Sequence, residues 1–125
     1  MAQKILIVED DPFLSSLLKT RLTKEGFEVV RAADGEQALA MLKEQKPNLM
    51  LLDLILPKKS GFEVLEAARA DAETKSLPVI IISNLGQDDD IRRGKELGVL
   101  DYIVKARISL DDLVKKVHTA LTPVG

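Results

Sequence analysis

The chain has 125 residues, 46% of them hydrophobic and 30% charged, with 18 basic side chains against 20 acidic ones. These values predict one globular domain, and the near-neutral balance of charge argues against a nucleic-acid-binding surface. Cysteine is absent, which excludes disulfides and thiolate metal sites, and the sequence shows neither a signal peptide nor a membrane-spanning run, so we expect a cytoplasmic protein with no membrane partner.

Short and nearly continuous apolar runs alternate along the chain with segments of helical periodicity. The runs cover residues 5–8, 29–33, 49–52, 79–82 and 100–104. Continuous apolarity is typical of strands that are buried on both faces, as they are in parallel sheets. The sequence therefore predicts five such strands, each followed by a helix.

The first helical segment carries clear signals for its two ends. Asp11 followed by Pro12 predicts an N-cap and a first helical residue, and Gly26 predicts the end of the helix. The leucines of this segment recur at helical spacing and are expected on one buried face: Leu14, Leu17, Leu18 and Leu22. By contrast, residues 84–98 contain few apolar side chains, which predicts a helix that is weakly anchored to the sheet.

Five strands that alternate with five helices predict an α/β fold, a doubly wound (βα)5 sandwich with helices on both faces of a parallel sheet. For a chain of this length we expect a five-stranded sheet of the flavodoxin-like order 2-1-3-4-5. In such folds ligands bind beyond the carboxyl ends of the strands, where strands 1 and 3 lie side by side. The residues that follow each strand are therefore the candidates for a functional site.

Charged or hydroxyl side chains follow four of the five apolar runs. Glu9 and Asp10 follow the first run, Asp53 the third, Ser83 the fourth and Lys105 the fifth. The second run, at the edge of the predicted sheet, ends in alanines and carries no such group. Two carboxylates about 4 Å apart repel each other by roughly 4 kcal/mol at an effective dielectric constant near 20. The three acids together therefore require a cation or a proton.

A site made only of carboxylate oxygens is suited to Mg²⁺, which binds through one or two carboxylates and keeps several waters. Beside a lysine and a hydroxyl, such a site is suited to the transfer of a phosphoryl group. Asp53 is the candidate nucleophile and would form an aspartyl phosphate, while Lys105 and Ser83 would contact the phosphoryl oxygens.

Four segments resemble the receiver domain of bacterial two-component response regulators: ILIVEDD, LLDLILPKKSG, VIIIS and DYIVK. They occur in the order and at the spacing of that family, and the resemblance covers the whole chain, residues 1–125, as a single receiver domain with no output domain. It implies that Asp53 is the phosphoacceptor. It also implies that Mg²⁺ is bound by Glu9, Asp10, Asp53 and the backbone carbonyl of Ile55.

The resemblance assigns three further roles near the ends of strands 4 and 5. Ser83 would be the switch hydroxyl, Lys105 the phosphate-binding lysine and Tyr102 an aromatic residue that changes its rotamer on activation. Lys105 is followed by Ala106, where the family typically has a proline whose peptide bond is often cis. A cis bond before alanine costs roughly 2.5–4 kcal/mol, which favours trans, but the sequence leaves the geometry of this bond open.

The implied function is a signalling switch that catalyses only its own phosphorylation and dephosphorylation, not the turnover of a substrate. A sensor histidine kinase or a phosphotransfer protein would donate the phosphoryl group. The output would be altered binding of a downstream protein at the face formed by helix 4, strand 5 and helix 5, with the chain as a monomer or a phosphorylation-dependent dimer.

Two alternatives to this function remain open. One is a magnesium-dependent phosphohydrolase with an aspartyl nucleophile, similar to the haloacid-dehalogenase-like enzymes. Those enzymes carry a second acid two residues after the nucleophile, where this chain has Ile55. The other alternative is a pseudo-receiver that binds its partners without being phosphorylated.

Overall fold

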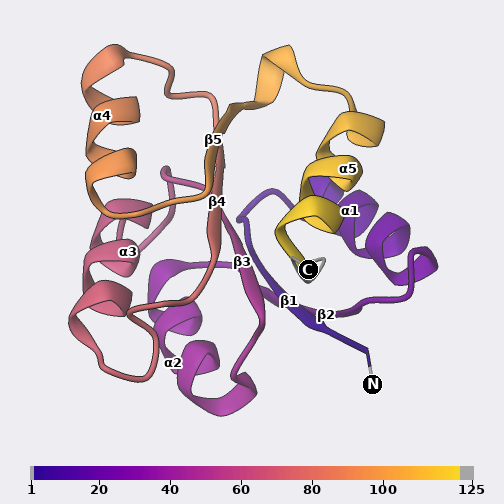
Figure 1. Ribbon diagram of the computed structural model, residues 1–125, viewed down its shortest axis with the longest axis horizontal. Coiled ribbons are helices and arrows are strands. Elements are labelled where there is room, and N and C mark those ends of the chain that lie inside the picture. Colours follow the sequence, from indigo (N-terminus) through magenta and orange to yellow (C-terminus); the bar gives the residue numbers. More distant parts are fainter. Residues whose placement is uncertain (1, 122–125) are drawn as a thin grey trace.

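The computed structural model describes residues 2–121. Within this part of the chain, five parallel strands form one sheet in the order β2-β1-β3-β4-β5, which confirms the predicted topology (Figure 1). The strands are β1 (Lys4–Val8), β2 (Glu28–Ala32), β3 (Leu49–Leu52), β4 (Val79–Ser83) and β5 (Asp101–Val104). Each predicted run differs from the observed strand by at most one residue at either end.

Helices cover both faces of the sheet, as predicted (Figure 1). On one face lie α1 (Pro12–Lys24) and α5 (Leu110–Leu121). On the other lie α2 (Gly35–Gln45), α3 (Gly61–Ala70) and α4 (Asp88–Glu96), and a short 3-10 helix, η1 (Lys105–Arg107), follows β5. None of the helices between residues 2 and 121 is both long and apolar enough to cross a membrane.

The sheet separates two apolar cores because successive residues of a strand point to opposite faces. Every residue of β3 and β4 is buried, which is the pattern predicted for strands covered on both sides. One set of strand residues packs under α1 and α5: Ile5, Ile7, Leu49, Leu51, Ile80 and Ile82. The alternate set packs under α2 and α3: Leu6, Val8, Met50, Leu52, Val79 and Ile81.

The ends of α1 follow the sequence signals, but its buried face does not follow them completely. The Asp11 carboxylate accepts a hydrogen bond from the Phe13 amide at 2.9 Å, and Gly26, just beyond the helix, has a φ of +95°. Leu17, expected on the buried face, is 45% exposed. Each residue turns the helix by about 100°, which places Leu17 about 100° from Leu18 and about 160° from Ser15, outside the buried arc.

Helix α4 is the weakly anchored helix that the sequence predicts. Among its residues, Asp88–Glu96, only Gly94 is buried. A Cβ atom at Gly94 would lie 3.0 Å from Cδ1 of Ile81 and 3.2 Å from Cδ2 of Tyr102, so the missing side chain allows α4 to lie close to β4 and β5. The helix therefore contacts the sheet through a small area and exposes most of its polar side chains.

Candidate functional site

Pairing between β1 and β3 brings two acids to the same level at the carboxyl edge of the sheet. Val8 pairs with Leu52, and the next residue on each strand is an acid, Glu9 and Asp53. The Asp53 amide donates a hydrogen bond to the Val8 carbonyl at 3.0 Å, and the Glu9 amide donates one to the Ala32 carbonyl at 3.1 Å. Both acids are therefore fixed by the main chain of neighbouring strands.

Asp10 completes a cluster of three carboxylates that fits a hard cation. One oxygen of each of Glu9, Asp10 and Asp53 lies within 4.8 Å of the others. Glu9 and Asp53 are buried, whereas Asp10 is exposed at the mouth of the cluster. Oε2 of Glu9 is buried without a hydrogen-bond partner. A desolvated carboxylate oxygen that lacks a partner is costly, and a set of oxygen ligands of this kind suits Mg²⁺.

The buried acids have a cationic partner in Lys105. Its Nζ lies 2.5 Å from Oε1 of Glu9 and 2.9 Å from Oδ2 of Asp53, and its side chain is only 20% exposed. Burial opposes the charge of the lysine, but the hydrogen bonds to the two acids outweigh burial and raise the pKa of Lys105. The lysine is therefore a fixed positive charge in contact with both central carboxylates.

The two central carboxylates differ in their readiness to ionise. Burial, together with the nearby Asp53 carboxyl group, raises the pKa of Glu9 from its ordinary 4.5 to about 7. Burial also opposes the ionisation of Asp53, but its interactions with Glu9 and with the Lys105 ammonium outweigh burial and lower the pKa of Asp53. The opposite directions of the two pKa shifts make Asp53 the member of the pair that ionises more readily.

The raised pKa of Glu9 predicts how the stability of the metal-free chain depends on pH. Between pH 4.5 and about 7 the folded chain keeps a proton on Glu9 that the unfolded chain releases, so the free energy of unfolding should fall as pH rises through this range. We expect Glu9→Gln to remove about 1–3 kcal/mol of that fall. Urea unfolding at several pH values, in the presence of EDTA, measures it.

The matched control is Glu44→Gln, because Glu44 is exposed on α2, outside the carboxylate cluster. It should keep the pH dependence of the unmodified chain. A Glu9→Gln curve that runs parallel to the unmodified curve from pH 5 to 8 would show that Glu9 does not hold the proton.

Ser83 ends β4, the strand next to β3. Leu52 pairs with Ile81, so Ser83 lies one residue beyond the level of Asp53. Its side chain is fully buried, and its Oγ accepts a hydrogen bond from the Leu85 amide at 3.3 Å. The serine hydroxyl is thus at the same edge of the sheet as the acids but is hydrogen-bonded to the following loop.

Tyr102, in β5, reaches the same loop from the other side. Its hydroxyl donates a hydrogen bond to the Leu85 carbonyl, and burial raises the pKa of Tyr102 to about 12. Leu85 is therefore hydrogen-bonded to Ser83 through its amide and to Tyr102 through its carbonyl. The loop that leads from β4 into α4 is held at one residue by both predicted switch side chains.

Ile55 lies beside the cluster through its backbone. Its amide donates a hydrogen bond to Oδ1 of Asp53 at 3.3 Å, while its side chain is 58% exposed. The Lys105–Ala106 bond, whose geometry the sequence left open, is trans, because no cis peptide occurs in residues 2–121. The structure therefore brings the three acids and the lysine into one cluster, with Ile55 and Ser83 adjacent to it and Tyr102 connected through Leu85.

One functional candidate was missed from the sequence. Arg31 lies in β2, the strand expected to contribute nothing, and its guanidinium donates hydrogen bonds to the carbonyls of Glu9 and Asp10. The available signal was a charged residue inside an otherwise apolar run, Val-Val-Arg-Ala-Ala. The hydrogen-bond partners of Arg31 could not be predicted from the sequence, because they depend on the path of the loop after β1.

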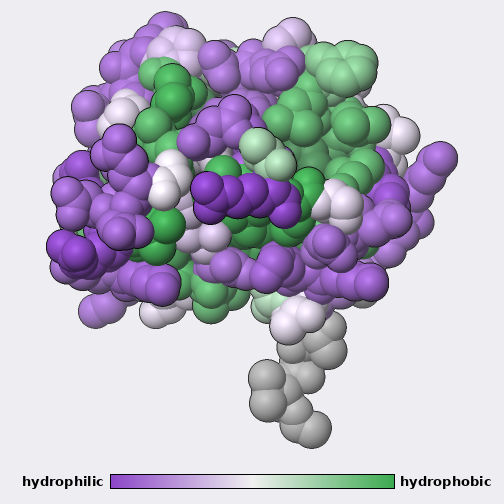
Figure 2. Space-filling model, turned by 90° about the horizontal axis from the view of Figure 1, so that it is seen from above, coloured by the Kyte–Doolittle hydropathy of each residue, from purple (hydrophilic) through white to green (hydrophobic). Residues whose placement is uncertain are grey.

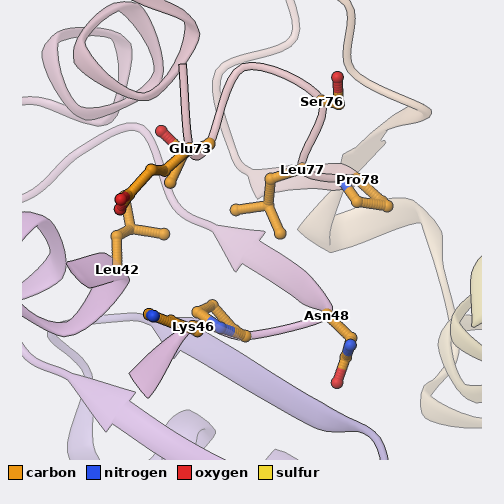
Figure 3. A pocket seen from close by; sticks show the side chains of 9 residues that line it. Leu42, Lys46, Asn48, Glu73, Ser76, Leu77 and Pro78 are labelled. Carbon is orange, nitrogen blue, oxygen red and sulfur yellow. The ribbon is translucent and has the colours of Figure 1, made fainter. Parts of the chain in front are cut away.

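A second concave region lies at the opposite edge of the sheet (Figure 3). Its volume is about 530 Å³, and its walls come from the segments before β3 and β4. Two of its polar lining residues already serve the fold: Asn48 Oδ1 accepts from the Lys4 amide at 2.7 Å, and Thr74 Oγ1 donates to the Ala68 carbonyl at 2.6 Å. Among its nine lining residues Glu73 is the one acid, so the pocket has no group of acids that could hold a cation.

Comparisons with known proteins agree on one kind of domain. Residues 5–118 match the family described as the response regulator receiver domain. The transcriptional regulatory protein CpxR of Klebsiella pneumoniae is 47% identical over 102 residues, which are 82% of this chain and 42% of CpxR. The chain spans about half the length, or less, of such curated regulators.

Two solved structures extend this similarity to three dimensions. The BeF3-activated N-terminal receiver domain of RstA from Klebsiella pneumoniae is 30% identical, with a TM-score of 0.87 over 97% of this chain and 100% of that chain. The Mn²⁺-bound form of the response regulator Rcp1 is 34% identical, with a TM-score of 0.83 over 98% of this chain and 97% of that chain.

Proposed function

Because the chain belongs to the response regulator receiver domain family, we propose that it is a phosphoacceptor switch of a two-component phosphorelay, with Asp53 as the acceptor. The observation that carries this proposal is the environment of Asp53. Its carboxylate is buried, in contact with the Lys105 ammonium, and adjacent to a Glu9 oxygen that lacks a partner. A signalling role, rather than metabolic catalysis, agrees with the relatives, which are named as transcriptional regulators.

In the proposed reaction a carboxylate oxygen of Asp53 attacks the phosphorus of a phosphohistidine on a kinase or phosphotransfer protein. A P–O bond forms while the P–N bond breaks, and the imidazole nitrogen keeps the electron pair and takes a proton from water. Asp53 is suited to this step because its pKa is lowered and it is therefore an anion. Mg²⁺, held by Glu9, Asp10, Asp53 and the Ile55 carbonyl, would neutralise charge on the transferring oxygens.

Lys105 and Ser83 would then respond to the new dianion. Lys105 already contacts Asp53 and can turn its ammonium from the carboxylates to a phosphoryl oxygen. Ser83 would exchange its hydrogen bond with the Leu85 amide for one to the phosphoryl group. Because Tyr102 holds the carbonyl of Leu85, this exchange would move the start of α4, the helix with the least buried surface.

The proposed partners follow from two surfaces. Figure 2 looks onto the edge at which the strands end, and apolar residues gather there on the right, the side of α1 and α5. Phe13 and Leu17 of α1 are 79% and 45% exposed, close in sequence to Asp10, so a phosphodonor protein has an apolar contact beside the acids. We place the downstream protein, or a second copy of the phosphorylated chain, at the α4–β5–α5 face.

The phosphohydrolase alternative has less support. Its general acid would stand two residues after Asp53, and that residue is Ile55. No observation on the described residues favours the hydrolase or the pseudo-receiver over the switch.

The proposal is tested by the intact mass of the chain after incubation with acetyl phosphate. With Mg²⁺ we expect the addition of one phosphoryl group per chain, and with EDTA we expect none. Sustained hydrolysis of p-nitrophenyl phosphate would instead favour the phosphohydrolase. An unchanged mass with both acetyl phosphate and phosphoramidate would favour the pseudo-receiver.

A further inference from the structure

Arg31 directs its guanidinium at the main chain of the loop that carries two of the three acids. Nε and Nη2 donate to the Glu9 carbonyl at 3.2 and 3.0 Å, and Nη2 also donates to the Asp10 carbonyl at 3.3 Å. All the hydrogen bonds that the guanidinium makes with residues 2–121 end on these two carbonyls. The arginine therefore contacts the backbone of the acids, while Lys105 contacts their side chains.

The backbone of Arg31 is held in a defined place by the sheet. Arg31 pairs with Ile7 in the parallel ladder between β1 and β2, and that ladder continues to Val8 and Ala32, directly before the loop. The planar fork of an arginine fixes two acceptors at once, which a flexible ammonium cannot do. The peptide groups that follow Glu9 and Asp10 are thus tied to the edge strand.

We propose that Arg31 is a positioning residue of the metal site, which orients Glu9 and Asp10 toward the ion by fixing the peptide groups that follow them. This inference rests on the proposed function, because it takes Mg²⁺ as the ion. Mg²⁺ requires near-octahedral geometry with short bonds, so a small rotation of the loop displaces its ligands. Loss of a partner that orients the ligands of a metal typically lowers affinity by about 10- to 100-fold.

The positive charge of Arg31 should weaken Mg²⁺ binding, whereas its hydrogen bonds should strengthen it. Substitutions can therefore distinguish the two effects. A guanidinium close to the site repels a divalent cation, so loss of charge alone would strengthen binding. Arg31→Lys keeps the positive charge and loses the fork. If Arg31 acts through geometry, this variant binds Mg²⁺ more weakly; if it acts only through charge, the affinity stays unchanged.

The experiment is a calorimetric titration of the full chain with MgCl₂ at constant ionic strength. We expect Arg31→Lys to bind Mg²⁺ about tenfold more weakly than the unmodified chain. The control is Arg92→Lys, the same substitution at an exposed arginine of α4 that pairs with Asp89, and it should leave the affinity unchanged. Arg31→Gln, which also loses the charge, should bind Mg²⁺ more tightly than Arg31→Lys if the fork is lost equally in both.

A second measurement separates this inference from the proposed function. The rate of phosphorylation by acetyl phosphate is followed against Mg²⁺ concentration, and the half-saturating concentration should rise more than the maximal rate falls. Equal Mg²⁺ affinity of Arg31→Lys and the unmodified chain overturns the role of Arg31 and leaves the switch intact. Mg²⁺ binding without phosphorylation by either acetyl phosphate or phosphoramidate overturns the switch and leaves the positioning role intact, and no Mg²⁺ binding by the unmodified chain overturns both.

Discussion

Replacement of Asp53 by asparagine is expected to abolish phosphorylation, with the initial rate lowered by at least about 100-fold. The amide cannot attack phosphorus as a carboxylate does, and its loss of charge removes one partner of Lys105. The mass gain with acetyl phosphate and Mg²⁺ should therefore disappear. The fold should persist, because Lys105 keeps its contact with Glu9.

The matched control for this variant is Asp11→Asn. Asp11 is adjacent to the acidic pair but caps α1, and asparagine is as good an N-cap as aspartate. This variant should be phosphorylated like the unmodified chain. If Asp53→Asn still gains one phosphoryl group at an ordinary rate, Asp53 is not the acceptor. Loss of phosphorylation in both variants would mean that the reaction depends on the negative charge near the cluster and does not identify Asp53 as the nucleophile.

Gly61→Ala should lower the free energy of unfolding by about 2–4 kcal/mol. A Cβ atom at Gly61 would lie 2.2 Å from the Asp53 carbonyl oxygen and 2.6 Å from Cα of Leu54, and neither backbone atom can move without displacing Asp53. The Gly61 amide also donates to the Leu54 carbonyl at 2.9 Å, which ties the start of α3 to this loop. Urea unfolding measures the loss of stability.

Gly86→Ala provides the control, because an added Cβ would meet only side-chain atoms of Val104, the nearest at 3.3 Å. Its effect should stay within about 1 kcal/mol. Helix propensity alone would favour alanine at Gly61 by up to about 1 kcal/mol, so the sign of the change is informative. A Gly61→Ala variant as stable as the unmodified chain would show that the loop after Asp53 can yield.

The fold was predictable because the apolar runs are continuous and the turns between elements carry strong signals. Parallel strands end at one edge, so the residue after each run was enough to predict the cluster of Glu9, Asp53 and Lys105. The observed contacts of Lys105 with both acids agree with that expectation. The chemical roles of these residues are predictions that the proposed experiments test.

Other features could not be read from the sequence, because they depend on the conformation of single side chains and loops. Helical spacing placed Leu17 with the buried leucines, but Ser15 fills the buried arc instead, with its hydroxyl hydrogen-bonded to the Pro12 carbonyl. A lone arginine in an edge strand has many possible partners, so the contacts of Arg31 emerged only from the path of the β1–α1 loop. The raised pKa of Glu9 depends likewise on how deeply that loop buries it.

The contact of the Lys105 ammonium with Glu9 and Asp53 also affects whether this domain stays folded when the concentration of metal ions changes. A site that relied on a dissociable cation would accumulate repulsion each time the ion left, and the strand ends would loosen. Here the countercharge is covalently part of the chain, so the resting form needs no ion to stay assembled. If the domain is the proposed switch, magnesium availability should set how readily it is phosphorylated, and the chain should stay folded when magnesium is removed.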